Sequence, residues 1–220
     1  MTYLENIEAI IFDLDGTLVD SMWIWKQIDI DFLEKRGIAL PEDLQKDIEG
    51  MSFTETAQYF LDRFQLNEPM EAIKDEWNAM AKDFYANRIP LKHDVKKIID
   101  HALKEGIKLG IGTSNSRELL MTVLEAHQMV SHFDAMRTSC EVKAGKPSPD
   151  IFLKVAEDLG VSPSKCLVFE DTFAGVQAAR NAGMRVIAIY DELSEPYRAE
   201  ITEAADHFIF GFSEIADDKS

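Results

Sequence analysis

The chain has 220 residues, of which 46% are hydrophobic and 29% charged, so it is long enough to bury a core as one domain or as two small ones. Its 40 Asp and Glu residues against 23 Lys and Arg give a formal net charge of −17. A surface this acidic argues against nucleic acid and membrane surfaces as partners, and a small anionic substrate needs a local cation to bind.

Short apolar runs that end in polar residues or a turn predict the strands of a parallel sheet. The first run covers residues 9–12, and four more follow at 107–111, 166–169, 186–190 and 207–210. Between them, segments with helical spacing end before Gly or begin at Pro. These segments are 94–105, 149–159 and 174–182. Strands that alternate with helices predict an α/β fold.

Residues 20–89 break this alternation. They contain no strand-like run, but they show helical patterns at 23–36, 41–48, 53–64 and 70–87. A crossover between two strands of one sheet needs far fewer residues. We therefore expect a small all-helical domain, residues 20–89, inserted into an α/β core of residues 1–19 and 90–220. The chain shows no internal repeat, and the acidic stretch at Asp217-Asp218 is interpreted as a tail.

The strongest chemical signal is Asp13-Leu14-Asp15-Gly16-Thr17, directly after the first predicted strand. Residues two apart in an extended chain point the same way, so both carboxylates are expected to face one site. Gly16 allows a sharp turn there, and ligands of open α/β sheets bind at these strand ends. The alternative is a calcium loop, which needs a preceding helix and a Glu at its twelfth position, where Ile24 stands.

Three other motifs lie beside predicted strands or helices: Ser114-Asn115, Lys146-Pro147 and Glu170-Asp171. Each motif alone also has an ordinary structural explanation. Ser114-Asn115 is typical of an N-cap of the helix beginning near Arg117. Lys146-Pro147 is typical of a helix that begins at Pro, and Glu170-Asp171 of a charge pair at a helix N-terminus. Taken together, they predict a site. With Asp13 and Asp15, the Glu170-Asp171 pair would bring four carboxylates to neighbouring strand ends, and these need a cation such as Mg²⁺. Lys146 is then expected to bind an anionic group, and the helix start after Ser114-Asn115 to bind phosphate through its N–H groups.

In this order, the four motifs resemble those of the haloacid dehalogenase superfamily of phosphohydrolases, over nearly the whole chain. The helical block resembles the C1-type cap of its β-phosphoglucomutase and phosphoglycolate phosphatase branch. The resemblance implies a Rossmann-like parallel-sheet core with an inserted all-helical cap domain. It also implies a Mg²⁺-dependent phosphoric monoester hydrolase that works through an aspartyl-phosphate.

The resemblance further implies a role for each motif residue. Asp13 would attack phosphorus, and Asp15 would act first as general acid and then as general base. Mg²⁺ would be held by Asp13, the backbone carbonyl of Asp15 and Asp171, with Glu170 in support. Lys146 would tie the phosphate to Asp13. The phosphate-binding residues implied are Ser114, Asn115 and Lys146.

Other members of the superfamily fit the sequence less well. Haloacid dehalogenases generally lack the residue that Asp15 provides here, and phosphonatases use a cap lysine, whereas surface lysines are usually solvated. β-Phosphoglucomutase-like enzymes, the main alternative, place a His and a basic residue in the cap. Residues 20–89 contain no His, and Gly50-Met51-Ser52-Phe53 has no Lys or Arg. A phosphatase is therefore favoured, and Asp13 argues against a non-enzymatic phospho-ligand sensor.

The helical block offers candidates for the pocket of the organic leaving group: Trp23, Trp25, Met51 and Phe53. Packing within the cap is the alternative for each of them. An apolar wall near acidic groups suits a neutral sugar or polyol better than a second phosphate, so we expect a sugar or polyol phosphate as substrate. Hinges near Val19-Asp20 and Ile89-Pro90 would let the cap close.

The remaining features of the sequence concern its surroundings. No apolar run approaches the roughly 20 residues of a membrane span, and residues 1–8 lack the basic lead-in of a signal peptide. The two cysteines, Cys140 and Cys166, form no disulfide framework and match no zinc-ligand spacing. We therefore expect a cytoplasmic protein that is monomeric, with a weak dimer as the alternative.

Overall fold

The computed structural model describes residues 2–216, and the acidic stretch at Asp217-Asp218 lies outside them. Its centre is a parallel sheet of six strands in the order β3-β2-β1-β4-β5-β6. The strands are β1 (Ala9–Phe12), β2 (Lys108–Thr113), β3 (Ala135–Thr138), β4 (Cys166–Glu170), β5 (Arg185–Ile189) and β6 (His207–Ile209). This confirms the predicted α/β class.

The five predicted strands are all present, whereas β3 was not predicted. It has only four residues, Ala135 to Thr138, and it lies at the edge of the sheet beside β2 alone. Its two middle residues are only partly buried, and one of them is Arg137. A strand this short, with no continuous apolar run, lacks the hydrophobic signal on which the prediction depends.

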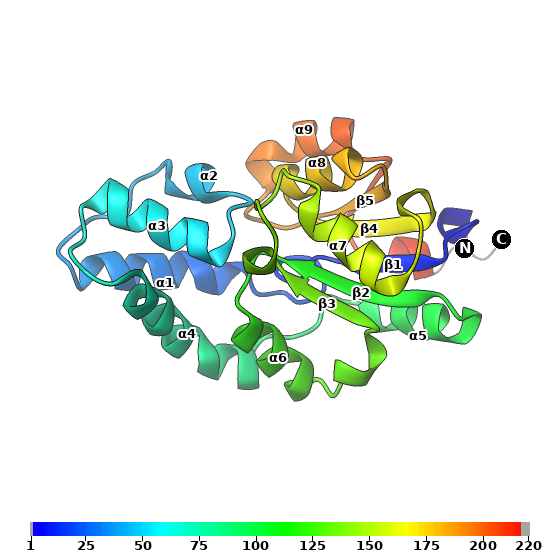
Figure 1. The fold of residues 1–220 in the computed structure, drawn as a ribbon, viewed down its shortest axis with the longest axis horizontal. Helices are drawn as coiled ribbons and strands as arrows, with labels where there is room; N and C mark the ends of the chain where they lie inside the picture. Colours follow the sequence, from blue (N-terminus) through cyan, green and yellow to red (C-terminus); the bar gives the residue numbers. More distant parts are fainter. Residues whose placement is uncertain (1, 217–220) are drawn as a thin grey trace.

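Helices cover both faces of the sheet (Figure 1). One face packs against α5 (Val95–Glu105), α6 (Arg117–Ala126) and α10 (Ser213–Ala216), and the other against α7 (Asp150–Leu159), α8 (Phe173–Asn181) and α9 (Arg198–Ala204). Because side chains alternate along a strand, β1 sends Ile10 and Phe12 to the first face and Ala9 and Ile11 to the second. All four are buried, as expected for a central parallel strand.

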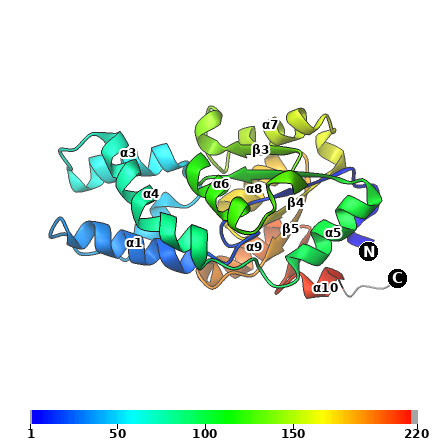
Figure 2. The same ribbon diagram turned by 90° about the horizontal axis from the view of Figure 1, so that it is seen from below.

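Four helices stand between β1 and α5, at one end of the sheet (Figures 1 and 2). They are α1 (Met22–Glu34), α2 (Leu44–Ile48), α3 (Phe53–Phe64) and α4 (Met70–Asn87). Aromatic rings form their core: the Phe60 ring lies 5.7 Å from Phe32 and 4.9 Å from Trp77, edge to face in both pairs. The predicted inserted helical domain is therefore present.

The chain crosses between the sheet and this helical block twice, and the two crossings lie side by side. Val19 and Leu91 form a β-bridge. On either side of it, the Asp20 N–H donates to the Pro90 carbonyl and the Lys92 N–H donates to the Leu18 carbonyl, both at 3.0 Å. Helix α4 also packs along α6 of the core. Among the described helices, none has the length and apolar character needed to cross a membrane.

Candidate active site

The loop after β1 places Asp13 and Asp15 at the end of the sheet that faces the helical block. Strand β1 pairs with β4 up to Phe12 and Phe169, and the Asp13 N–H continues the ladder to the Phe169 carbonyl at 3.0 Å. Gly16, with φ of +82°, then turns the chain so that its N–H reaches the Val19 carbonyl at 2.9 Å. The motif is therefore held by main-chain bonds at both ends.

Lys146 lies between two carboxylates in the buried interior. Its Nζ is 2.6 Å from Asp13 Oδ1 and 2.5 Å from Glu170 Oε1, and all three side chains are less than 10% exposed. Burial raises the pKa of Asp13 to about 7, and Lys146 opposes this shift. Burial lowers the pKa of Lys146, but the two carboxylates more than offset it, so the net shift is upward and the ammonium stays charged.

Glu170 is fully occupied by hydrogen bonds. Its Oε1 meets Lys146, while its Oε2 accepts from the N–H groups of Asp171 and Thr172 at 2.8 and 2.9 Å and from Thr172 Oγ1 at 3.0 Å. The carboxylate lies so close to α8 that a Cβ on Gly175 would come within 1.8 Å of it. Glu170 therefore holds Lys146 in place.

Asp15 turns its carboxylate toward the helical block. Oδ1 accepts from Ser21 Oγ at 2.5 Å and from the Tyr85 hydroxyl, and Oδ2 accepts from Asn115 Nδ2 at 2.7 Å. Burial, and then the neighbouring Asp15, raise the pKa of Tyr85 well above its usual value, so the phenol keeps its proton for this bond. Asp15 and Glu170 thus bind donors of their own, although both line the same cavity as Asp13.

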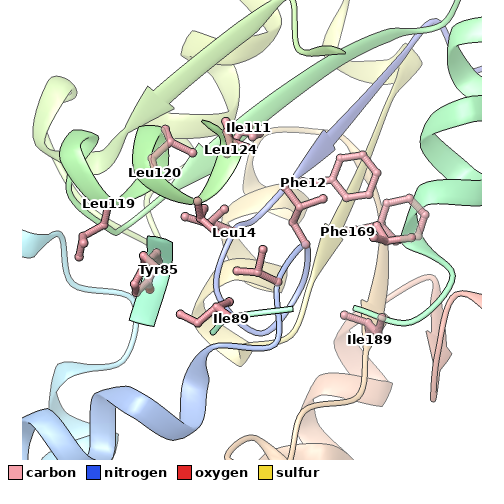
Figure 3. Close-up of a cluster of buried hydrophobic side chains, with 14 of the residues drawn as sticks. Phe12, Leu14, Tyr85, Ile89, Ile111, Leu119, Leu120, Leu124, Phe169 and Ile189 are labelled. Carbon is pink, nitrogen blue, oxygen red and sulfur yellow. The ribbon is translucent and has the colours of Figure 1, made fainter. Parts of the chain in front are cut away.

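Tyr85 was not predicted as a site residue. It follows Ile73, Trp77 and Ala81 at intervals of four along α4, a pattern that is typical of helix core, and all four residues are buried. Figure 3 shows Tyr85 near Leu119 of α6 and on the same side as Leu14 of the loop after β1. No sequence signal separates its hydroxyl from an ordinary core tyrosine.

Asp171 is the remaining carboxylate of the predicted metal site. Its Oδ1 accepts from Thr17 Oγ1 at 3.0 Å, and its buried Oδ2 has no hydrogen-bond partner. Oδ2 faces Gly16 so closely that a Cβ there would lie 2.3 Å from it. Burial raises the pKa of Asp171 well above its ordinary value, and the charges of Glu170 and Asp13 add to this.

These features fit a hard cation. An unpartnered, buried carboxylate oxygen close to the charge of Asp13 is stabilised when a cation neutralises both groups. Within residues 2–216, no three His, Cys, Asp or Glu side chains surround one point. A site of two carboxylates, a main-chain carbonyl and water suits Mg²⁺, which keeps several of its waters.

The segment after β2 differs from the prediction in one respect. Helix α6 is capped by Ser116, whose Oγ accepts from the Leu119 N–H at 3.2 Å, and Ser114 and Asn115 precede this cap. The Asn115 N–H donates to Thr113 Oγ1 at 3.0 Å, while the Ser114 carbonyl accepts from the Phe53 N–H at 3.0 Å. Ser114 thereby connects the core to the start of α3.

A cavity of about 200 Å³ lies between the sheet end and the helical block. Trp25, Met51 and Phe53 line it, as expected. The expectation for Trp23 is wrong: its side chain is half exposed and packs on Phe84, outside the cavity. Two residues along a helix differ by about 200° in direction, so Trp23 and Trp25 point to opposite sides.

The charges around this cavity are unequal. Lys146 is the one basic residue among the described residues that line it, and no Lys, Arg or His of the helical block takes part. Carboxylates line it from both the core and the helical block: Asp13, Asp15, Asp29, Glu49 and Glu170. Burial raises the pKa of Glu49, whose Oε1 accepts from the Ala174 N–H at 2.9 Å.

Comparison with known proteins agrees with this geometry. The family model of haloacid dehalogenase-like hydrolases matches residues 10–189. A phosphorylated carbohydrates phosphatase of Thermotoga maritima is 30% identical over 190 residues, or 86% of this chain and 88% of that protein. Hexitol phosphatase B of Escherichia coli K12 is 26% identical over 191 residues, 86% of each chain. The crystal structure of a CbbY variant from Rhodobacter sphaeroides, in complex with xylulose-1,5-bisphosphate, has a TM-score of 0.84 at 26% identity and covers 94% of this chain and 96% of that one.

Proposed function

The chain belongs to the haloacid dehalogenase-like hydrolases, and from that premise we propose that it is a Mg²⁺-dependent phosphatase of sugar or polyol phosphates with Asp13 as its nucleophile. The observation that carries the assignment of the nucleophile is the contact of 2.6 Å between Lys146 Nζ and Asp13 Oδ1 inside a cavity shared by core and cap. The buried ammonium opposes the rise in the pKa of Asp13 that burial causes, and so favours the ionised, nucleophilic carboxylate.

The reaction takes place in two displacements. An Asp13 oxygen forms a bond to phosphorus while the ester P–O bond breaks, and Asp15, protonated for this step, gives the proton to the leaving alkoxide. Water then attacks the aspartyl-phosphate and gives a proton back to Asp15, which releases inorganic phosphate and restores Asp13. Asp13, the Asp15 carbonyl and Asp171 would hold Mg²⁺, which would supply positive charge near the phosphoryl oxygens.

The phosphate-binding roles belong to residues near the Asp13 end of the cavity. Ser114, Asn115 and Lys146 all line it. Lys146 contacts Asp13 directly, so an incoming phosphoryl group meets a cation next to the nucleophile. Glu170 acts indirectly, by holding Lys146.

A mutase of the β-phosphoglucomutase type is the alternative function, and the charges of the cavity argue against it. Such an enzyme must hold a second phosphate on the cap side. Glu49 and Asp29 stand there, and the described cap residues contribute no cation to the lining. Coulomb repulsion from these carboxylates favours a neutral leaving group over a second phosphate.

The cap covers residues 20–89 and the core residues 1–19 and 90–220 in this proposal. The hydrogen bonds between the two crossings support these boundaries, since Asp20 and Pro90 sit where the paired segments end. Movement about the crossings would open the cavity to substrate and close it during the reaction.

The test is release of inorganic phosphate with Mg²⁺ from sugar phosphates, polyol phosphates, p-nitrophenyl phosphate and acetyl phosphate. The wild type is expected to turn over a sugar or polyol phosphate, and Asp13→Asn is expected to lose activity by at least about 10³-fold while staying folded. Asp20→Asn, an exposed Asp of the same loop, is the matched control and should retain activity. Mg²⁺-dependent release by Asp13→Asn would contradict the assignment, and isomerised sugar phosphate without free phosphate would favour the mutase.

A further inference from the structure

Asp29 is a buried carboxylate of the cap that the proposed mechanism does not use. It belongs to α1, lines the cavity, and is 6% exposed. Its Oδ2 accepts a hydrogen bond of 2.7 Å from Gln45 Nε2 of α2. Its Oδ1 accepts no hydrogen bond from residues 2–216 and is not among their fully buried atoms, and no Lys, Arg or His of these residues pairs with Asp29.

A carboxylate in this position is unfavourable for folding by itself. Burial raises the pKa of Asp29 to about 7, and the hydrogen bond from Gln45 only partly opposes the shift. Burial of a charge is offset when donors reach both oxygens, and here the protein supplies a donor to only one of them. A hydroxyl group in the cavity would supply that donor.

We propose that Asp29, oriented by Gln45, determines specificity by binding a hydroxyl group of the organic part of the substrate. This inference rests on the proposed phosphatase function and adds the residues that select for polyols and sugars. The free Oδ1 of Asp29 accepts a hydrogen bond from one hydroxyl of the substrate. The second N–H and the Oε1 of Gln45 are available to the hydroxyl on the adjacent carbon. Both side chains line the same cavity as Asp13, so one substrate can meet them and the nucleophile together.

The walls around Asp29 suit the rest of such a molecule. Trp25 and Phe53, whose ring centres lie 6.1 Å apart, line the cavity, and their apolar faces pack against the C–H groups of a sugar or polyol. An alkylammonium group is a different chemistry that an anion beside aromatic rings also attracts. We favour the hydroxyl because Gln45 presents both donor and acceptor groups, which a diol matches and an ammonium does not.

The experiment compares matched substrates with and without hydroxyls: glycerol 1-phosphate against propyl phosphate, and sorbitol 6-phosphate against hexyl phosphate. For at least one pair, the wild type is expected to prefer the hydroxylated compound by roughly 10- to 100-fold in kcat/KM, since leaving buried polar groups unpaired penalises the analogue. In Asp29→Ala, this preference should fall to about threefold or less, because the loss in kcat/KM falls mainly on the hydroxylated compound.

A matched control lies on the same helix. Asp31 accepts from Gln27 Nε2 at 2.7 Å, as Asp29 does from Gln45, but its side chain is exposed and lies outside the cavity. Asp31→Ala should keep the wild-type preference. Gln45→Met, which leaves Asp29 without its donor, should lose part of the preference, and Asp29→Asn provides the test if Asp29→Ala does not fold.

Three results would overturn the inference. The first is an equal loss of kcat/KM on hydroxylated and alkyl phosphates in the Asp29 variants. The second is a wild type that prefers the hydroxylated compound in neither pair. The third is a wild type that prefers phosphoethanolamine over glycerol 1-phosphate. Hydrolysis of p-nitrophenyl phosphate by the wild type, and its loss in Asp13→Asn, reports the phosphatase function separately. The two proposals can therefore fail independently.

Discussion

The indole Nε1 of Trp25 donates a hydrogen bond of 3.0 Å to the hydroxyl of Tyr85, which in turn donates to Asp15. Trp25 and Tyr85 belong to two cap helices, whereas Asp15 belongs to the catalytic loop of the core. The proposed general acid is thus oriented by side chains of the cap. If the cap moves as proposed, this chain of hydrogen bonds would couple its closure to the orientation of Asp15.

Tyr85→Phe is expected to lower kcat by about 2- to 10-fold, with a smaller change in KM, because a hydrogen bond that orients the protonated Asp15 contributes roughly 0.5–1.5 kcal/mol. Steady-state kinetics on p-nitrophenyl phosphate measure the effect. Tyr59→Phe serves as control, since the Tyr59 hydroxyl bonds Asp47 away from the cavity. Wild-type kcat in Tyr85→Phe would show that Asp15 needs no support from the cap.

Lys146→Met is expected to lower the free energy of unfolding by about 3–5 kcal/mol and to abolish activity, since it leaves Asp13 and Glu170 buried without a cation. Urea unfolding measures the first effect. Lys165→Met breaks an exposed ion pair with Glu8 and should cost at most about 1 kcal/mol. An equal loss of unfolding free energy in the two variants would mean that the buried ion pairs of Lys146 stabilise the fold no more than the exposed pair of Lys165 does.

Gly16→Ala is expected to destabilise the protein more than Gly37→Ala. Both glycines have positive φ, +82° and +71°, so both variants carry backbone strain of about 1–2 kcal/mol. Only at Gly16 does the new Cβ meet a neighbour, Asp171 Oδ2 at 2.3 Å, while nothing lies within 4 Å of it at Gly37. The difference in melting temperature between the two variants measures the cost of the steric clash with Asp171. Indistinguishable melting temperatures would show that no such clash occurs.

Mg²⁺ is expected to raise the melting temperature of the wild type, because an ion that binds only the folded state stabilises it. Asp171→Asn should be at least as stable as the wild type without the ion, since its buried, unpartnered oxygen no longer carries charge, and it should respond little to added Mg²⁺. Asp20→Asn should respond as the wild type does. A full response in Asp171→Asn would place the ion elsewhere.

Asp29 makes stability depend on pH. Its pKa rises from an ordinary 3.8 to about 7 on folding, so the folded state binds the proton more tightly than the unfolded chain. This stabilising contribution is complete below pH 4 and is lost as the pH rises to 7. The free energy of unfolding of Asp29→Asn relative to the wild type should therefore increase between pH 4 and 8, by at most about 4 kcal/mol.

Urea unfolding at several pH values measures this difference. The acidic groups that share the cavity with Asp29, among them Glu49 and Asp15, remain in the variant, as does Lys146, so their contributions largely cancel. Asp31→Asn on the exposed side of α1 should give a difference that does not change with pH. A constant difference for Asp29→Asn would show that its carboxyl is solvated when the protein is folded.

Much of the core was predictable, because central parallel strands are continuous apolar runs and the helices between them end at glycines such as Gly106 and Gly160. Motif residues that directly follow strands were also predictable as a cluster, since parallel strands bring their ends to one edge. Strand β3 was missed because an edge strand with two half-buried residues carries little hydrophobic signal.

The cap side of the site was harder to predict. Tyr85 follows the spacing of a core face, and Asp29 stands among the buried positions of α1, so neither differs in sequence from ordinary helix positions. Whether such a side chain meets Asp15 or Gln45 depends on how the cap helices pack against one another and against the core. That packing depends on contacts between distant segments, which a pattern of spacing within one helix does not contain.

The two crossings between core and cap have a consequence for engineering and evolution. Val19 and Leu91 are paired neighbours although seventy-two positions separate them, so the chain leaves the sheet and returns to it at a single point. A short turn can bridge that gap without rethreading any strand. The helical block is therefore an insertion at one point of the chain, and the strands of the core keep their order on either side of it.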